Sequence, residues 1–406
     1  MSVNPVNGWD MLVTAASETT FGTTPVPAST AAYTALAVES IDCDLGGAEV
    51  GVIRPKQDRS VGRGMQSGWV EGRVQPLAWT FDTSLKSRAA VDTASPLLVF
   101  LKSAGLLHTV NAASNVTITS PGDPSASAFA SMTLQRFLGQ GSAPLAETLR
   151  GCVAKSVSIS GAAGELLAKF SGMGIGKSTA LSQAGAQGRV DSVTCTNVAT
   201  SLTLTAGETA RLGIGYYLIE SEIVLVTAAT PGTTTATITR AQLGTVAVAH
   251  TAAALVPYRP PAPTYAGSPI SEPTSTVSFG SVIGAMRCRS WSIDITTGID
   301  LLEPETGSRY SQGWKYTRTD AKVKVQLVLS ADQASLFGMA AAHPTGNALA
   351  ISQGVGVGGI FTFNAPNAEL QPFKVPAPAN DISIVDVEFR LRDSTAGNDM
   401  FNIVLT

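Results

Sequence analysis

Segments in which apolar and polar residues alternate dominate this 406-residue chain, and that spacing is typical of a half-buried β-strand. The clearest are 153–160 (VAKSVSIS), 235–241 (TATITRA), 321–329 (AKVKVQLVL) and 382–392 (ISIVDVEFRLR). Helical segments are few. Residues 95–105 (SPLLVFLKSAG) start with a serine N-cap and a proline and stop at Gly105, and residues 331–342 are a second candidate. The pattern predicts a mainly β protein.

Composition narrows the function classes. Charged residues are 14% of the chain, against about 25% in ordinary domains, and the net charge is −3. No overall basic field exists to hold nucleic acid by counterion release, so general DNA binding is not expected. No apolar run approaches the roughly 18 residues of a spanning helix, and the first residues lack the features of a signal peptide. We therefore expect a protein that stays, or assembles, in the cytoplasm.

The four cysteines are scattered without a C-x-x-C pair, so they indicate neither a zinc site nor a dithiol redox site. They are Cys43, Cys152, Cys195 and Cys288. We expect them to be buried free thiols.

Two breaks in composition divide the chain. A proline-rich stretch at 256–273 is the best linker candidate, and small residues cluster at 181–188. A compact block at about 189–256 lies between them. The predicted units are therefore a first large unit (1–185), a small inserted β domain (186–260) and a second large unit (261–406).

The two large units share an order of sequence segments. S-I-D occurs at 40–42 and again at 292–294, and G-W-x-x-x-R occurs at 68–73 and again at 313–318. A helix candidate follows in each unit. Each then ends on what the pattern predicts to be a strand pair: 152–160 with 165–172 in the first unit, and 382–392 with 400–405 in the second. The shared order predicts an internal duplication.

Each unit also carries a polar segment rich in Gly, Arg and Ser after its S-I-D strand, at about 46–71 in the first unit. Strand-like residues flank it, which predicts a long projecting β-hairpin. An exposed edge of this kind invites pairing with another chain. The alternative is an ordinary surface loop.

The middle block contains two strand-like segments, 216–228 (YYLIESEIVLVTA) and 233–241 (TTTATITRA), joined by a turn signal at 230–233. We expect Glu220 and Glu222 to share a solvated strand face. The block is interpreted as a small β domain that decorates the outside of an assembly. A sharper hypothesis is glycan binding, for which the stacking surfaces would be Tyr216, Tyr217 and Tyr258.

One stretch, 171–179 (SGMGIGKST), imitates a phosphate-binding loop, which requires G-x-x-x-x-G-K-[ST] before a helix. Ser171 stands where the first glycine should be, and the residues that follow have no helical period. Nucleotide binding is therefore not predicted. The three histidines (His108, His250 and His343) lack metal-ligand spacing, and no G-x-S-x-G motif occurs. No catalytic, cofactor-binding or metal-binding residue is predicted, and the chain is not expected to be an enzyme.

Taken in order, several segments carry a resemblance. They are the S-I-D strand, RPKQDRSVGRG, WVEGRVQPLAWTF, SPLLVFLKSAG and LRGCVAKSVSISGAAGELLAKFSGMG, preceded by ASETTFGTTP at 16–25. This set resembles the major tail tube proteins of long-tailed, non-contractile bacteriophages, and the doubled unit resembles those with two tube domains in one chain. The similarity covers 10–180 well and 275–406 more weakly. The middle block lies outside it, although Arg240–Thr245 followed by His250 is similar to a β element common in virion structural proteins.

The resemblance implies two β-sandwich tube domains, each with a flanking short α-helix and a long hairpin arm. Three chains would form a pseudo-hexameric ring around a lumen, and rings would stack into the virion tail after assembly in the host cytoplasm. The implied partners are further copies of the chain, tail terminator and tail tip proteins, and a tape measure protein in the lumen. DNA would pass through without sequence-specific binding, and no cofactor is implied.

By the same resemblance, the arms would contact the next subunit or ring. The residues concerned are Arg54, Lys56, Arg59, Arg63 and Trp69 in the first arm, and Glu303, Glu305, Arg309 and Trp314 in the second. The first arm is basic where the second is acidic, a contrast that suits complementary contacts between unlike repeats. The alternatives are a virion-associated glycan-binding protein or hydrolase with a β-sandwich core, and a capsid decoration protein.

Overall fold

The computed structural model of the chain describes residues 11–22, 34–36, 40–43, 50–53, 70–74, 76–87, 97–120, 129–138, 145–162, 165–175, 178–180, 190–212, 215–230, 232–242, 245–257, 270, 275–280, 283–286, 288–303, 311–328, 347–356, 358–374, 384–393 and 399–406. These residues form large antiparallel sheets, so the prediction of a mainly β protein is confirmed.

The strands of the first unit are β1 (Met11–Ser17), β2 (Thr34–Leu36), β3 (Ser40–Cys43), β4 (Val50–Ile53), β5 (Val70–Val74), β6 (Leu77–Ser84), β7 (Leu107–Asn111), β8 (Asn115–Thr119), β9 (Met132–Leu138), β10 (Leu145–Ala162), β11 (Leu166–Gly174) and β12 (Ser178–Ala180). Helix α1 (Leu98–Ser103) lies between β6 and β7.

The strands of the second unit are β19 (Thr276–Phe279), β20 (Ile283–Met286), β21 (Cys288–Thr296), β22 (Ile299–Leu301), β23 (Trp314–Tyr316), β24 (Asp320–Val328), β25 (Asn347–Gln353), β26 (Phe361–Leu370), β27 (Ile384–Leu391) and β28 (Asn402–Leu405). All four strands singled out from the sequence are present, as parts of β10, β17, β24 and β27.

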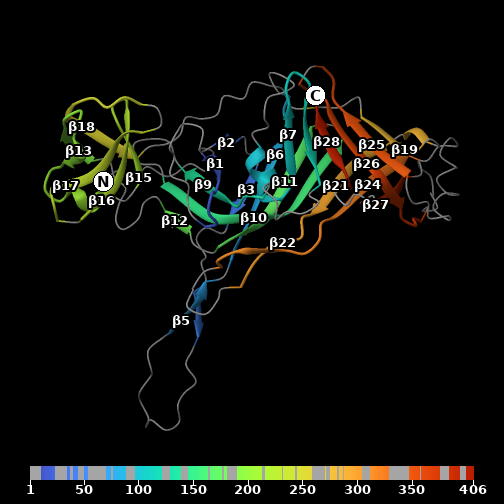
Figure 1. Ribbon diagram of the computed structural model, residues 1–406, viewed down its shortest axis with the longest axis horizontal. Helices are drawn as coiled ribbons and strands as arrows, with labels where there is room; N and C mark the ends of the chain where they lie inside the picture. Colours follow the sequence, from blue (N-terminus) through green and yellow to red (C-terminus); the bar gives the residue numbers. More distant parts are fainter. Residues whose placement is uncertain are drawn as a thin grey trace, which may run out of the picture.

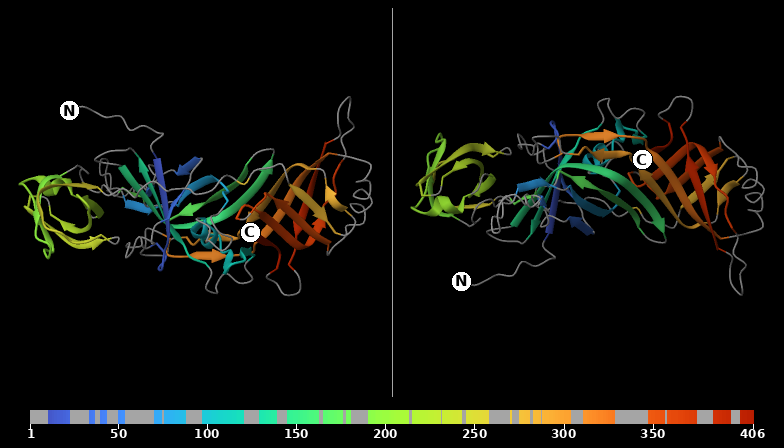
Figure 2. Two further views of the ribbon diagram at one scale, coloured as in Figure 1. Left: turned by 90° about the horizontal axis from the view of Figure 1, so that it is seen from above. Right: turned by 90° about the horizontal axis from the view of Figure 1, so that it is seen from below.

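In the sequence, the inserted barrel lies between the two units, and it has its own hydrophobic core. Its strands are β13 (Val190–Cys195), β14 (Ser201–Thr203), β15 (Gly215–Ile219), β16 (Glu222–Ala229), β17 (Thr235–Gln242) and β18 (His250–Pro257), with the 3₁₀ helix η1 (Glu208–Arg211). They close in the order β13-β14-β17-β16-β15-β18. None of the described strands of the barrel pairs with a strand of the two units, and Figure 2 shows the barrel at one end of the molecule.

The two units repeat one order of strand pairing. In the first, β9 joins β1 to β10, and β11 joins β6 to β10. In the second, β25 joins β19 to β26, and β27 joins β24 to β26. The last strands, β12 and β28, pair with β10 and β26 respectively. The order of pairing therefore repeats, as the order of sequence segments predicted.

A shared irregularity makes the correspondence residue by residue. In β10 one extra residue is accommodated between Leu149 and Cys152, and in β26 one is accommodated between Ala365 and Ala368. Such a bulge bends a strand, and beyond it each long strand exchanges a partner, β9 for β11 in the first unit and β25 for β27 in the second. In β10 the bend coincides with Gly151, whose φ of 61° favours glycine. In each unit one long strand therefore connects the two sets of strands that pair on either side of its bulge.

Register followed outward from this bulge corrects one detail of the sequence alignment. Across β11 and β27 it matches Asp82 with Gln326, and then Ser40 with Ser290. The S-I-D at 40–42 is therefore two residues out of step with the S-I-D at 292–294. A slip of two leaves each side chain on the same face, so the alternating pattern could not detect it.

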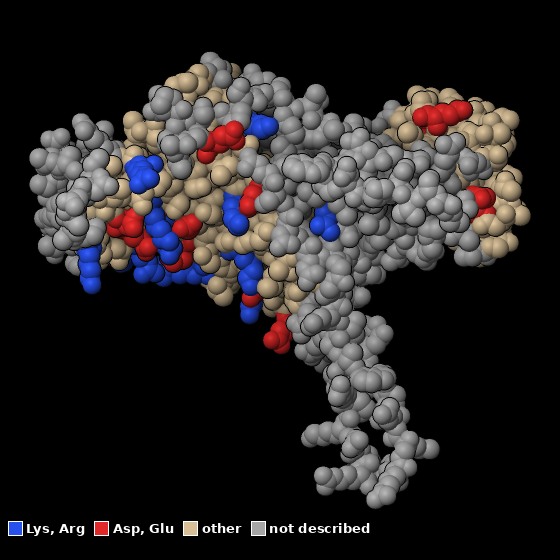
Figure 3. Space-filling model, turned by 180° about the vertical axis from the view of Figure 1, so that it is seen from behind, with Lys and Arg blue, Asp and Glu red and all other residues tan. Residues whose placement is uncertain are grey.

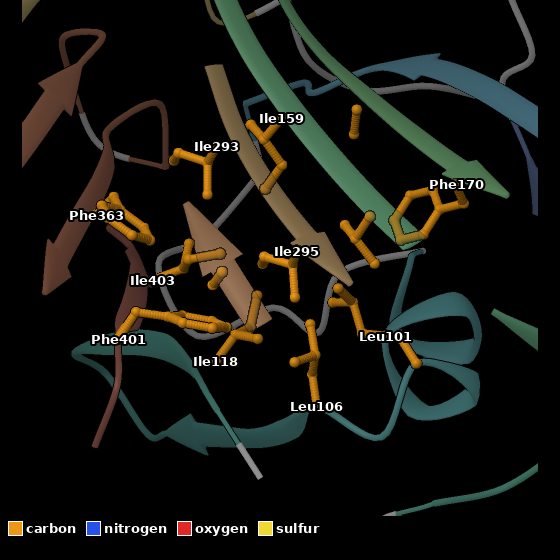
Figure 4. Close-up of a cluster of buried hydrophobic side chains, with 14 of the residues drawn as sticks. Leu101, Leu106, Ile118, Ile159, Phe170, Ile293, Ile295, Phe363, Phe401 and Ile403 are labelled. Carbon is orange, nitrogen blue, oxygen red and sulfur yellow. The ribbon is translucent and has the colours of Figure 1, made fainter. Parts of the chain in front are cut away.

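The units are fused along one continuous sheet, here called the inner sheet, with the order β3-β6-β11-β10-β21-β24-β27-β26. In the other layer, β8 of the first unit pairs with β28 of the second. The core is continuous as well (Figure 4): Ile159 of β10 and Phe170 of β11 share it with Ile293 of β21 and Phe401 of the second unit.

The predicted helix is present but short. Gly105 ends it with a φ of 72°, and the N–H groups of Gly105 and Leu106 donate to the carbonyls of Lys102 and Leu101. This is the Schellman arrangement, which satisfies the last carbonyls of a helix. The helix N-cap is Leu97, without a side-chain cap bond; the predicted Ser95 cap lies outside the described residues, as does the helix predicted at 331–342.

Two further predictions are wrong. Strand β28 does not pair with β27 as expected; it pairs with β26 and β8, because the second unit reuses the pairing order of the first. The segment 216–228 is two strands rather than one, since Glu220, with a φ of 52°, turns the chain between β15 and β16. The turn predicted at 230–233 is confirmed by the hydrogen bond from Thr233 N–H to the Thr230 carbonyl.

Most of the proline-rich stretch lies outside the described residues, but Ile270 within it is buried in the core. Its N–H donates to the Leu85 carbonyl, and its carbonyl accepts from Leu166 N–H. Residue 270 is thus fixed to the sheets on both sides.

Candidate assembly surface

The junction between the two units is the best-described contact between repeats. Strand β10 pairs with β21 over seven positions, from Ser156 opposite Thr296 to Ala162 opposite Ser290. The Ser158 hydroxyl donates to the Asp294 carboxylate at 2.7 Å. The Thr297 hydroxyl donates to the Ala154 carbonyl at 2.8 Å and continues the attachment beyond the end of β21. The junction is therefore made mainly by backbone pairing.

The base of the second arm is the hairpin β22–β23, which begins directly after β21 and lies beneath β10 (Figure 1). Ile299 and Leu301 are buried against Val153 and Ile175 of the first unit. The Lys155 ammonium lies 3.0 Å from the Asp300 carboxylate. The arm of one unit thus packs on the end of the preceding unit.

The predicted arm residues fall into two groups. Arg54, Lys56, Arg59, Arg63, Trp69, Glu305 and Arg309 lie outside the described residues. Trp314 lies on β23, half-buried, with its ring centroid 4.1 Å from that of Phe129 in the first unit. Glu303 is exposed beyond the end of β22. Trp314 therefore joins two units of one chain, and the subunit contacts predicted for the arms remain predictions.

Two strands of the first unit correspond to the junction strands of the second but have fewer partners. Strand β21 pairs with β10 and β24, whereas its counterpart β3 pairs, among the described strands, only with β6. Strand β28 pairs with β8 and β26, whereas its counterpart β12 pairs, among the same strands, only with β10. At the other edge of the inner sheet lies β26, the counterpart of β10. The chain continues from β26 into residues 371–374, which correspond to the part of β10 that pairs with β21. The two edges of the inner sheet are therefore complementary in the order of their strands.

The outward face of the inner sheet is mainly polar, although Leu167 is 40% exposed on it, and it differs between the units. The first unit carries several serines and one ion pair: the hydroxyls of Ser156 and Ser171 lie 2.6 Å apart, and Lys169 lies 3.5 Å from Asp82. Charges of both signs line the second unit, along the lower surface in Figure 3. Lys324 lies 3.8 Å from Asp294 there, and exposed pairs of this kind contribute little stability. The face is a mixed surface without a dominant charge.

The inserted barrel holds a buried ionic cluster. Glu222 is fully buried and accepts hydrogen bonds from Arg240 Nε at 2.7 Å, from His250 Nε2 at 2.9 Å and from the N–H groups of Ala241 and Val248. Arg240 also donates to the Thr196 and Val248 carbonyls. The cluster thus fastens two loops to the barrel wall.

This burial overturns the prediction that Glu220 and Glu222 share a solvated face. The turn at Glu220 leaves that residue exposed, 2.9 Å from His250 Nδ1, and sends Glu222 inward. Burial by itself would raise the pKa of Glu222, but the bonds from Arg240, Ala241, His250 and Val248 outweigh it and lower the pKa to about 2. A carboxylate whose oxygens are already occupied and hidden from solvent is structural rather than catalytic.

The residues proposed for glycan stacking are not available as a group. Tyr217 is buried in the barrel core at 2% exposure. Burial raises the pKa of Tyr216 to about 12, and Tyr258 lies outside the described residues.

The segment 171–179, whose sequence is similar to a phosphate-binding loop, does not have the local structure of one. Ser171–Gly174 belong to strand β11, and Ser178 begins strand β12 where a phosphate loop would begin a helix.

Sequence reasoning missed several residues of this surface. Lys155, Thr297 and Phe129 gave no signal because their partners are more than 140 residues away or belong to the other unit. Glu18, within ASETTFGTTP at 16–25, gave no signal of a structural role either. Its buried carboxylate accepts from Ser131, Thr133 and the N–H groups of Gly22 and Gly151, and so ties β1 to the bend in β10.

No protein-family model matches this sequence, and no curated protein matches it. Within the described residues, no helix is long and apolar enough to cross a membrane. No group of His, Cys, Asp or Glu among them could hold a metal ion.

Proposed function

We propose that this chain is a structural subunit that joins copies of itself head to tail into rings. Stacked rings would form the tail tube of a long-tailed bacteriophage, through which DNA leaves the capsid. In this proposal the two units are two tube domains of β-sandwich type, and the inserted barrel decorates the outside.

One observation carries the proposal: the β10–β21 junction is a template for a junction between chains. The inner sheet begins at one edge with β3, the counterpart of β21, and ends at the other with β26, the counterpart of β10. If β26 of one copy met β3 of the next, the same pairing would be repeated. Such a head-to-tail contact generates a closed ring when the rotation closes, and strand addition satisfies otherwise unpaired edge groups.

The resemblance supplies the number of copies, three, and the identity of the assembly. The polar outer face of the inner sheet supports its use as a lumen wall, since intermixed charges and hydroxyls do not grip a polyanion. The glycan-binding alternative is not supported, because Tyr217 is buried.

Purified full-length protein, examined by electron microscopy and sedimentation velocity over a series of concentrations, tests the proposal. Rings and hollow tubes are expected to replace monomers as concentration rises. A protein that remains monomeric at every concentration would overturn it.

The register offers a sharper test. Ser156 opposite Thr296 in the junction corresponds to Gln371 opposite Gly46 of the next copy. Gln371→Cys with Gly46→Cys, in a chain whose Cys43 is replaced by serine, should yield disulfide-linked oligomers under oxidation. The matched control, Pro372→Cys with Gly46→Cys, faces the other side of the sheet and should crosslink far less.

A further inference from the structure

The described surface contains an arginine-lined pocket at the end of the second unit. Arg318, Arg390, Arg392 and Asp393 line it, and its volume is about 280 Å³. Arg390 lies 3.6 Å from Asp320, and Arg392 Nε donates to Glu369 at 2.6 Å. No described side chain forms an ion pair with Arg318. A guanidinium has five donors, so one carboxylate each leaves these arginines with capacity for a further anion.

The residues of this pocket have counterparts in the first unit. Register from the shared bulge matches Glu369 with Val153, Arg390 with Met173 and Arg392 with Ile175. In the first unit these three apolar residues belong to the small cluster that receives the base of the second arm. The pocket therefore occupies the arm-docking position of the second unit.

The sequences of the two arms indicate which residue would enter the pocket. The pairing register that matches Ser290 with Ser40 and Thr296 with Gly46 matches Ile299 of the second arm with Glu49 of the first. Ile299 is buried against Val153 and Ile175 of the first unit, and the counterparts of these two residues in the second unit are Glu369 and Arg392. A carboxylate at the position of Ile299 would therefore lie beside the arginines of the pocket. Glu49 itself lies outside the described residues and enters by its place in the sequence.

We propose that the pocket binds the Glu49 carboxylate of a second copy of this chain, with Arg318 and Arg390 as its main donors. The contact rests on the proposed head-to-tail assembly. At the junction between chains the arm would then be held by an ion pair, whereas at the junction within the chain it is held by an apolar contact. Since Ile299 and Leu301 would meet Glu369 and Arg392 in the wrong place, the difference also enforces the alternation of first and second units around a ring.

Charge reversal tests the pairing in the full chain. Glu49→Arg and Arg318→Glu should each raise the concentration needed for assembly about tenfold, and the double variant should return it to near the wild-type value. Glu165→Arg and Arg289→Glu reverse exposed charges elsewhere and serve as matched controls. A thermal melt of each monomer shows whether the fold is kept.

The outcomes separate the two proposals. If the wild-type chain does not assemble, the proposed function fails. If it assembles and Glu49→Arg assembles equally well, only the pocket proposal fails. If both single variants are impaired and the double variant is not rescued, Glu49 and Arg318 do not meet, and the pairing is likewise overturned.

Discussion

Where the first unit offers Val153 and Ile175 to the arm that packs beneath it, the second unit offers Glu369 and Arg392 at the same positions of the same strand order. Likewise the outward face of the inner sheet carries mainly serines and one Lys169–Asp82 pair in the first unit, and several paired charges in the second. The strand order tolerates this divergence because backbone pairing does not depend on side chains that point outward. Two repeats can therefore keep one fold while their contact surfaces specialise, one toward the same chain and one toward another copy.

The largest expected effect comes from removing the first arm, which has no intrachain counterpart of the Ile299 contact among the described residues. Deletion of Val52–Gly64 should abolish polymerisation while the monomer melts as before, because the core lies elsewhere. Electron microscopy and a thermal melt measure both. Intact tubes after the deletion would contradict a role for the arm in assembly.

The inserted barrel lies outside both repeated units, so a substitution in it serves as a control for substitutions in the units. Glu222→Gln should destabilise it by about 4 kcal/mol, because Arg240 and His250 lose a buried partner. Hydrogen exchange should rise in peptides from 190–257 and stay unchanged in β10 and β24. Since the pKa of Glu222 is lowered from 4.5 to about 2, its stabilisation is complete above pH 4.5 and lost as the pH falls toward 2. Uniform exchange across the whole chain would show that the barrel is not independent.

The junction within the chain can be broken at Gly161. A Cβ there would lie 2.4 Å from Gln353 Oε1 and 2.5 Å from the Trp291 ring. Gly161→Val should therefore cost about 3 kcal/mol in unfolding free energy, measured by denaturant titration. Ser160→Ala, on the outward face next to it, should cost far less, and equal costs would argue against close packing across the junction.

Truncation of the second arm's base should have a smaller effect. Ile299→Ala removes a buried side chain from a small cluster at the edge of the core and should cost about 2 kcal/mol. In the first arm, Glu49→Ala at the corresponding position should leave the monomer's stability unchanged. A destabilised Glu49→Ala monomer would mean that the first arm also packs within its own chain.

The smallest effect is expected for the ion pair beside that cluster. Lys155 and Asp300 are 37% and 41% exposed, so Lys155→Met should cost less than about 1 kcal/mol. A loss of several kcal/mol in the same titration would show that the pair, rather than the apolar contact, holds the arm base.

The sequence by itself determined the strand class, four strand positions, the stop at Gly105 and the repeated order of segments, because these follow from local periodicity and from residues with special backbone preferences. Only the tertiary structure decided which strands meet. Alternation assigns faces but names no partner, so β28 and the S-I-D register were misplaced. The alternating pattern also could not predict that Glu222 is buried, because its burial depends on a turn at Glu220 and on hydrogen-bond donors 18 and 28 residues away. The docking of the second arm on the first unit was equally invisible, since it joins residues separated by most of the chain.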